Sequence, residues 1–280
     1  MKYGMNLLLW SGEINEELLP VLEQLKSMGY DGVEIPMFNL GLDYSRWGKR
    51  LDDLGLSRTA VTVRNLEDNP ISSDAAVRAK GIALNNQTLD CCAAVGAEIL
   101  VGPYHSAIGH FSGSGPTNDE WKWGVESMRA VADHAGKLGV KLGVEALNRF
   151  ECYFLNAHAD AARFVRQVSH PACRMMYDTF HANIEEKNAT GVLNEIRDVL
   201  GHVHISENDR STPGAGHVDW KATFEGLRST GYDGWLVIEA FGMALPELAA
   251  ATKIWRRMFN SELQLAEQGL KFMKQHMQIN

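Results

Sequence analysis

The chain has 280 residues, of which 45% are hydrophobic and 22% are charged, and its formal net charge at pH 7 is −8. This composition is typical of a globular protein, and a negative surface disfavours nucleic acid as a partner because it repels the phosphate backbone. None of the cysteines forms a Cys-x-x-Cys pair, so we expect a reducing compartment and no disulfide framework. The sequence has neither a signal-peptide pattern nor the ~20 apolar residues that cross a bilayer, which predicts a cytoplasmic protein without a membrane partner.

Short runs with β-strand character alternate with longer helical patterns along the whole chain. The predicted strands cover residues 3–9, 32–35, 57–63, 98–101, 141–145, 173–178, 202–205 and 236–239. Several of the intervening helical segments end at a glycine that is followed at once by a strand, as in "SMGYDGVEI" and "KLGVKLGVE". Glycine favours the left-handed conformation that ends a helix, so this punctuation supports a repeated strand–helix unit.

The strand–helix alternation indicates parallel strands joined by helical crossovers. Roughly eight such units in one chain of this length predict an α/β fold of the closed (β/α)8 or TIM-barrel type. A doubly wound open sheet is the alternative, but "LLLWSGEINEE" is not the glycine-rich phosphate loop expected after its first strand. No linker divides the chain, so residues 1–280 are predicted to form a single domain that ends in an amphipathic helix.

The carboxyl ends of all strands of such a barrel meet at one rim. Consecutive predicted strands carry ionisable residues at or near these ends, namely Glu145, Asp178, His204 and Glu239. A buried carboxylate without a partner is costly, and three neighbouring carboxylates need a positive partner to stay ionised. Three oxygen ligands and one imidazole suit Mn²⁺, Co²⁺ or Mg²⁺, whereas structural zinc prefers thiolates or several imidazoles. The rim is therefore predicted to bind a divalent metal.

Each of these residues has an ordinary interpretation when it is taken alone. Asp178 could cap the helix that follows it, His204 could be a satisfied core residue, and Glu239 could pair with a lysine. Independent caps and pairs, however, would not need to fall on successive strand ends. Glu34, near the end of the second predicted strand, is expected to support the ligands from behind.

Further polar residues follow the same strands: Arg149 and Glu151 the fifth, His181 the sixth and Arg210 the seventh. Together with aromatic residues they suit an uncharged, hydroxyl-rich substrate. The aromatic candidates are Trp10, Phe180 and Phe241. His181 could instead bond locally in a first helical turn, and Arg210 could be a surface charge on a mobile loop. The loop 102–121 is expected to overhang the mouth as a lid, and His202 and His217 are interpreted as structural.

Four segments of the sequence resemble the ketose 3-epimerases, the group that includes the D-tagatose, D-psicose (D-allulose) and L-ribulose 3-epimerases of the xylose-isomerase-like barrel superfamily. The segments are "VEALNRFE" (144–151), "DTFHANIEE" (178–186), "GHVHISENDRSTPGAGHVDW" (201–220) and "GYDGWLVIEAF" (231–241). The strand order and the "MKYGMN" start match as well. The resemblance implies an isomerase of carbohydrate metabolism with a free ketose as substrate, assembled as a homodimer or homotetramer.

The resemblance also implies roles for individual residues. Glu145, Asp178, His204 and Glu239 match the residues that hold the divalent metal, most often Mn²⁺, and Glu151, His181 and Arg210 match those that hold the substrate. Glu145 and Glu239 would transfer the C3 proton on opposite faces of a cis-enediolate. The match is poor in the loop 102–121 and around residues 64–70, so the preferred ketose is not implied.

Other functions remain open from the sequence. An aldose–ketose or hydroxypyruvate-type isomerase would use the same barrel and metal but move hydrogen between C1 and C2. A non-catalytic, metal-dependent sugar-binding barrel would keep the same ligands without turnover. An endonuclease for abasic DNA would need more histidines at the rim, and the acidic charge disfavours it.

Overall fold

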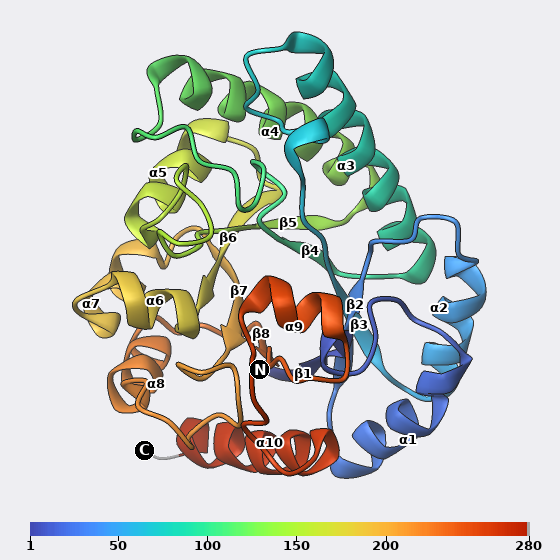
Figure 1. The fold of residues 1–280 in the computed structure, drawn as a ribbon. Helices are drawn as coiled ribbons and strands as arrows, with labels where there is room; N and C mark the ends of the chain where they lie inside the picture. The colour runs from blue at the N-terminus through green and yellow to red at the C-terminus, as the bar shows by residue number, and fades with distance from the viewer. Residues whose placement is uncertain (279–280) are drawn as a thin grey trace.

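The computed structural model describes residues 1–278, and in this part of the chain eight parallel strands form a closed barrel in the order β1 to β8 (Figure 1). The strands are β1 (Lys2–Asn6), β2 (Gly32–Pro36), β3 (Ser57–Val61), β4 (Ile99–Gly102), β5 (Lys141–Glu145), β6 (Cys173–Asp178), β7 (Leu200–Ile205) and β8 (Trp235–Ile238). The α/β prediction of a (β/α)8 barrel is thereby confirmed.

Helices surround the strands on the outside of the barrel, apart from α9, which lies across its mouth (Figure 1). They are α1 (Leu19–Met28), α2 (Tyr44–Asp53), α3 (Ala75–Val95), α4 (Asn118–Leu138), α5 (His158–Val168), α6 (Thr179–Glu185), α7 (Ala189–Ile196), α8 (Trp220–Ser229), α9 (Pro246–Thr252) and α10 (Glu262–Gln278). The predicted glycine caps are present at Gly29 and Gly139, whose φ angles of 95° and 71° are left-handed. No helix among residues 1–278 combines the length and the apolar character needed to span a membrane.

The predicted first strand, residues 3–9, is wrong beyond Asn6. The Asn6 side chain accepts a hydrogen bond from the backbone N–H of Leu8 at 2.9 Å and starts the short 3-10 helix η1 (Leu7–Leu9). All three leucines of η1 are buried, so their apolar run looked like a continuing strand. Two further 3-10 helices, η2 (Glu16–Leu18) and η3 (Leu66–Asp68), lie in the connections after β1 and β3. The third strand likewise ends at Val61, two residues before its predicted end.

The core lies between the barrel and its ring of helices. Strand residues such as Leu100 and Leu142 are fully buried, as are Met128 and Val131 on the inner face of α4. Helices on the outside leave the two ends of the barrel as the accessible faces, and the carboxyl ends of the strands open at one of them. The C-terminal helix α10 packs against α1, α8 and β8 (Figure 1).

Gly32→Ala should destabilise the barrel, because β2 approaches its neighbours closely at this residue. A Cβ atom on Gly32 would lie 2.1 Å from the backbone oxygen of Ser57 and 2.7 Å from the Trp235 ring. We expect the free energy of unfolding to fall by about 3 kcal/mol, measured by urea denaturation. Gly12→Ala is the control, since nothing lies within 4 Å of its added Cβ, and equal stability of the two variants would contradict the expectation.

Candidate metal and substrate site

The four residues predicted as metal ligands lie together at the mouth of the barrel. Glu145 and Asp178 are the last residues of β5 and β6, His204 is the penultimate residue of β7, and Glu239 follows β8. One ligand atom from each lies within 4.8 Å of the others, and all four residues are buried. The closed barrel explains this convergence. Its parallel strands all end at the same rim, which brings together residues that are up to 94 positions apart in the sequence.

His204 provides the observation that tests whether these residues fit a cation. Its Nε2 lies 2.7 Å from Oε1 of Glu34 and donates to that carboxylate. Its Nδ1 is buried, has no hydrogen-bond partner among the described residues, and lies 3.5 Å from both Asp178 Oδ2 and Glu239 Oε1. An imidazole nitrogen without a protein hydrogen-bond partner, beside carboxylate oxygens, is a donor set that fits a divalent cation once its proton has left.

Glu34 holds His204 from below. Its Oε1 also accepts from Asn6 Nδ2 at 3.0 Å, and its Oε2 accepts from Thr59 Oγ1 at 2.8 Å and lies 3.1 Å from His202 Nε2. Burial alone would raise the pKa of Glu34, but His204 and His202 lower it far below its usual range. The ionised carboxylate therefore fixes the orientation of His204 and keeps its Nδ1 directed at the mouth.

The Arg210 side chain lies inside the site. Its Nη1 lies 2.7 Å from Glu239 Oε2 and 3.3 Å from Asp178 Oδ2. The guanidinium also lies over the rings of Phe180 and Phe241, at 3.7 and 5.0 Å from their centroids. Arg210 is 5% exposed, so the structure does not place it as a surface charge. It neutralises part of the carboxylate charge while leaving its Nη2 group available.

His181 lies beside Arg210 on the first turn of α6. Its Nδ1 accepts the backbone N–H of Asn148 at 3.0 Å, so the neutral ring carries its proton on Nε2. Burial lowers the pKa of His181 to about 3, although the Asp178 carboxylate opposes the shift. Nε2 lies 3.2 Å from Arg210 Nη2 and 3.5 Å from Glu145 Oε1. Two N–H groups side by side suit an oxygen atom of a ligand as their shared acceptor.

Protons on Glu145 and His204 lower the electrostatic cost of the carboxylate cluster. Burial, followed by repulsion from Glu239 and Asp178, raises the pKa of Glu145 well above its usual value. Burial alone would raise the pKa of Asp178, but Arg210 lowers it far below its usual range. Burial alone would lower the pKa of His204, yet Glu34 and Glu239 raise it well above its usual value. Glu145 and His204 therefore hold protons that must leave before a cation can bind to them.

A cavity of ≈ 290 Å³ opens above these residues. Its polar wall consists of Glu145, Glu151, His181, Arg210 and Glu239. The rest of the lining is mostly apolar. Leu147 and Phe241 follow β5 and β8, and the other residues come from α9 and from the ends of β1 to β4 and the segments after them: Leu8, Phe38, Val61, Val63, Asn65, Pro103, Ile108, Leu248, Ala251 and Thr252. A mainly apolar cavity with a few convergent polar groups is the usual form of a small-molecule site.

Several sequence-based candidates lie away from this cavity. Trp10 does not line it, and Arg149 is turned outward, where it pairs with Glu185 at 2.7 Å and is 63% exposed. Of the loop 102–121, only Pro103 and Ile108 contribute to the wall. The loop residues 111–117 are exposed instead.

Two asparagines that the sequence analysis did not select hold the polar wall in place. Asn6 Nδ2 lies 3.3 Å from Glu239 Oε1, and Asn148 Nδ2 donates to Glu151 Oε1 at 2.8 Å. Asn6 is the last residue of β1, so it would count among the strand-end residues if that strand were predicted to end at residue 6. Asn148 lies three residues after Glu145, in a segment whose turn is not visible from periodicity.

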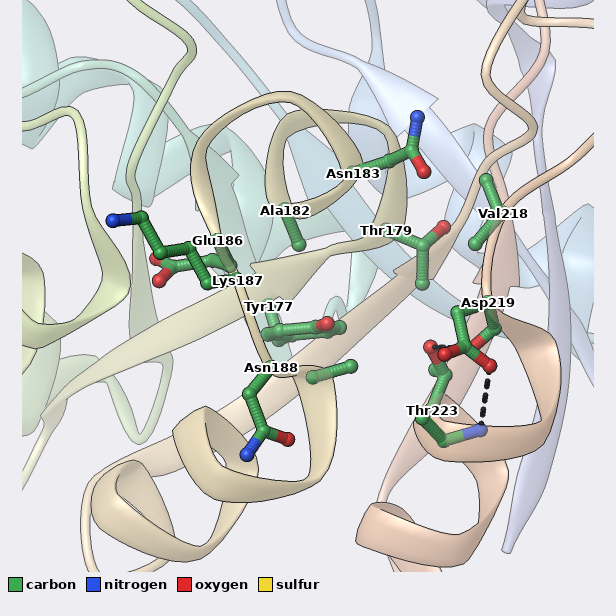
Figure 2. A pocket seen from close by; sticks show the side chains of 12 residues that line it. Tyr177, Thr179, Ala182, Asn183, Glu186, Lys187, Asn188, Val218, Asp219 and Thr223 are labelled. Carbon is green, nitrogen blue, oxygen red and sulfur yellow. Dashed lines mark hydrogen bonds between the residues drawn. The ribbon is translucent and has the colours of Figure 1, made fainter.

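A second cavity, of ≈ 180 Å³, lies between α6, α7 and α8 (Figure 2). Tyr177, Thr179 and Ala182 lie along one side of it, and Asp219 and Thr223 face them from α8 and the residue before it. None of the predicted site residues lines this cavity. The helix α6 thus separates it from the mouth, toward which Asp178 and His181 point.

The closed parallel barrel, with three carboxylates and an imidazole at its mouth, defines this chain as a TIM-barrel protein with a candidate metal site. Comparisons with known proteins identify its family. The model of the xylose isomerase-like TIM barrel family matches residues 22–276. A probable ketose 3-epimerase of Synechocystis sp. is 30% identical over 100% of this chain and 98% of its own length. The D-psicose 3-epimerase of Agrobacterium fabrum is 31% identical over 91% of this chain and 90% of its own length.

Solved structures agree with these relatives. The crystal structure of the D-allulose 3-epimerase from Methylomonas sp. in complex with D-allulose superposes with a TM-score of 0.93. It is 28% identical and covers 99% of this chain and 97% of that chain. The chain belongs to the xylose isomerase-like TIM barrel family and, within it, to the ketose 3-epimerases.

Glu34→Gln should weaken metal binding although Glu34 is not a predicted ligand, because its carboxylate contacts the predicted ligand His204. An amide cannot accept as strongly from His204, Asn6 and Thr59, so the imidazole loses its fixed orientation. We expect the affinity for Mn²⁺ to fall about 10- to 100-fold, measured by isothermal titration calorimetry. Thr59→Val is the control, because it removes one hydrogen-bond donor to Glu34 and leaves the carboxylate itself in place. If Thr59→Val lowered the affinity for Mn²⁺ as much as Glu34→Gln, the carboxylate would not be what orients His204.

Metal binding should also strengthen as the pH rises. Glu145 and His204 both have raised pKa values, and a cation can bind only after their protons leave. Below both pKa values, the affinity for Mn²⁺ should fall by up to about a hundredfold for each unit that the pH decreases. Titration calorimetry in buffers of different ionisation enthalpy counts the released protons. An affinity that is independent of pH would contradict this expectation.

Proposed function

We propose that this chain is a metal-dependent ketose 3-epimerase that inverts C3 of a free ketose. The single observation that carries the proposal is the pair of carboxylates, Glu145 and Glu239, in the wall of one cavity, beside the His204 Nδ1 that has no hydrogen-bond partner among the described residues. The names of the similar proteins support the same activity.

The residues that would hold the metal are Glu145, Asp178, His204 and Glu239. Their donor set suits Mn²⁺ best in our proposal, and Co²⁺ or Mg²⁺ would use the same ligands. When bound, the cation would supply positive charge that polarises the ketose carbonyl and makes the neighbouring C3 proton more acidic.

Proton transfer would fall to the two glutamates. β5 and β8 are separated by two strands on one side of the closed barrel and by four on the other, so Glu145 and Glu239 reach the cavity from different sides. Inversion of C3 requires one base to remove the proton from one face and another group to return a proton on the opposite face. Glu145 and Glu239 are the carboxyl groups of the wall that meet this requirement.

His181 and Arg210 would stabilise the negative charge that develops on the ketose oxygen as a cis-enediolate forms. Their Nε2–H and Nη2–H groups lie 3.2 Å apart and can share that oxygen as an acceptor. Glu151, oriented by Asn148, would accept a hydrogen bond from a substrate hydroxyl group.

The charge of the cavity supports a free sugar over a sugar phosphate. Among the described residues that line it, Arg210 carries the fixed positive charge, and that charge already lies 2.7 Å from Glu239. A phosphate group would need further cationic or backbone N–H donors. An uncharged ketose needs only hydrogen bonds at one end and apolar contacts at the other.

Deuterium incorporation tests the proposal. The purified protein is incubated in D₂O with Mn²⁺ and D-fructose, D-tagatose or L-ribulose, and the products are analysed by NMR. We expect deuterium at C3 of at least one ketose. Deuterium at C1 or C2 instead would identify an aldose–ketose isomerase, and no incorporation with retained sugar affinity would identify a binding protein.

Glu145→Gln and Glu239→Gln should each lower kcat by a factor of about 10³, because each removes one of the two proton-transfer groups. The metal content of each variant is measured alongside, since both residues are also proposed ligands. Saturating Mn²⁺ should not restore turnover. Glu225→Gln on the exposed face of α8 is the control and should keep full activity. Full activity in either site variant would contradict the two-base mechanism.

A further inference from the structure

Glu207 is a fully buried acid that has no place in the proposed chemistry. It lies two residues beyond β7, at the start of the loop 206–219 that leads into α8, and it is 0% exposed. It does not line the cavity at the mouth. A buried carboxylate is costly unless its oxygen atoms are fully hydrogen-bonded, so its surroundings require an explanation.

Within the part of the chain that the structure describes, the Glu207 carboxylate accepts four hydrogen bonds, and they come from its own loop or from the first residue of α8. Oε1 accepts the backbone N–H groups of Asn208 and Val218, each at 3.1 Å. Oε2 accepts the backbone N–H of Gly214 at 2.8 Å and the indole N–H of Trp220 at 2.9 Å. Each of these donors is uncharged, and four is about the number that a carboxylate can accept. The loop is therefore folded around this carboxylate.

Gly216 shows how closely the loop is folded around Glu207. A Cβ atom on Gly216 would lie 2.6 Å from Glu207 Oε1 and 2.1 Å from Asn208 Oδ1. Only a glycine leaves room for the carboxylate at this position.

Arg210 lies within the same loop and has an unfavourable backbone conformation. Its φ of 61° is left-handed, which a non-glycine residue keeps only where the surroundings fix it. Its N–H donates to the backbone oxygen of Glu207 at 3.0 Å, and its carbonyl accepts from the N–H of Phe241 at 2.9 Å. The left-handed backbone of Arg210 is thus held by contacts within the loop and with Phe241, and from it the guanidinium reaches Glu239 and Asp178.

We propose that Glu207 is a positioning residue, whose buried carboxylate folds the loop 206–219 so that Arg210 reaches the substrate. The part that concerns substrate rests on the proposed function, whereas the placement of Arg210 does not. Glutamine at this position keeps the size of the side chain but brings an NH₂ group against N–H donors. The loop should then loosen and release Arg210.

The first test uses no substrate. Hydrogen–deuterium exchange of residues 206–218 is compared between the wild-type protein, Glu207→Gln and Asp209→Asn. Asp209→Asn is the same acid-to-amide change in the same loop, but among the described residues Asp209 Oδ1 accepts only the N–H of Ser211, at 3.1 Å. We expect at least about tenfold faster exchange in Glu207→Gln only. The crystal structure of Glu207→Gln should show Arg210 displaced from Glu239, and unchanged exchange with Arg210 in place would overturn the proposal.

The second test measures whether Glu207 acts through Arg210. Glu207→Gln should lower kcat/KM about a hundredfold in the wild-type background but less than about threefold in an Arg210→Lys background. Equal losses in both backgrounds would overturn the proposal, because they would indicate a general structural effect. Should Glu207→Gln not fold, Trp220→Phe, which removes one of the four donors, must show the same pattern to a smaller degree.

The two tests separate failure of this proposal from failure of the proposed function. Absence of turnover in the wild-type protein would contradict the epimerase activity, while the exchange experiment and the position of Arg210 would still decide the role of Glu207.

Discussion

The burial of three carboxylates at one end of the barrel is the constraint on which the rest of the site depends. Glu145, Asp178 and Glu239 are all buried, and their mutual repulsion is too large to be left uncompensated. The structure supplies a guanidinium 2.7 Å from Glu239 and an imidazole nitrogen 3.5 Å from two of the carboxylates. A cation bound among the three carboxylates would offset the rest of their repulsion. The negative charge that opposes folding would then serve to bind the metal.

A second set of side chains determines the orientation of the first. Glu34 fixes His204, Asn6 links Glu34 to Glu239, and Asn148 holds the His181 ring. In each histidine, the hydrogen bond to one ring nitrogen leaves the other ring nitrogen available to a ligand. The Nδ1 of His204 and the Nε2–H of His181 point into the mouth because their other ring nitrogens are already hydrogen-bonded. Reactivity at the mouth therefore depends on hydrogen bonds that lie below and behind it.

The barrel divides the cavity into two chemically different halves. Strands β5 to β8 and the segments after them supply the charged wall, whereas the segments after β1 to β4, together with α9, supply most of the apolar wall. A small polyol can be held by its reacting oxygen atoms on the first side and by contact alone on the second. The charged wall thus restricts the position of the reacting end of a substrate by hydrogen bonds, whereas the apolar wall restricts the distal end only by its shape.

The sequence alone predicted the repeated strand–helix pattern, the bounds of β5 and β6, and the four strand-end residues that the structure brings together. Those four residues were predictable because the strand ends of a closed parallel barrel converge. The sequence did not reveal that β1 ends at Asn6, since a buried 3-10 turn of leucines has the same apolar pattern as a strand. Nor did it distinguish Arg210, which enters the cavity, from Arg149, which pairs outside with Glu185. Those outcomes depend on contacts between residues far apart in the chain, such as the hydrogen bond of His204 to Glu34 across 170 positions, and only the tertiary structure decides them.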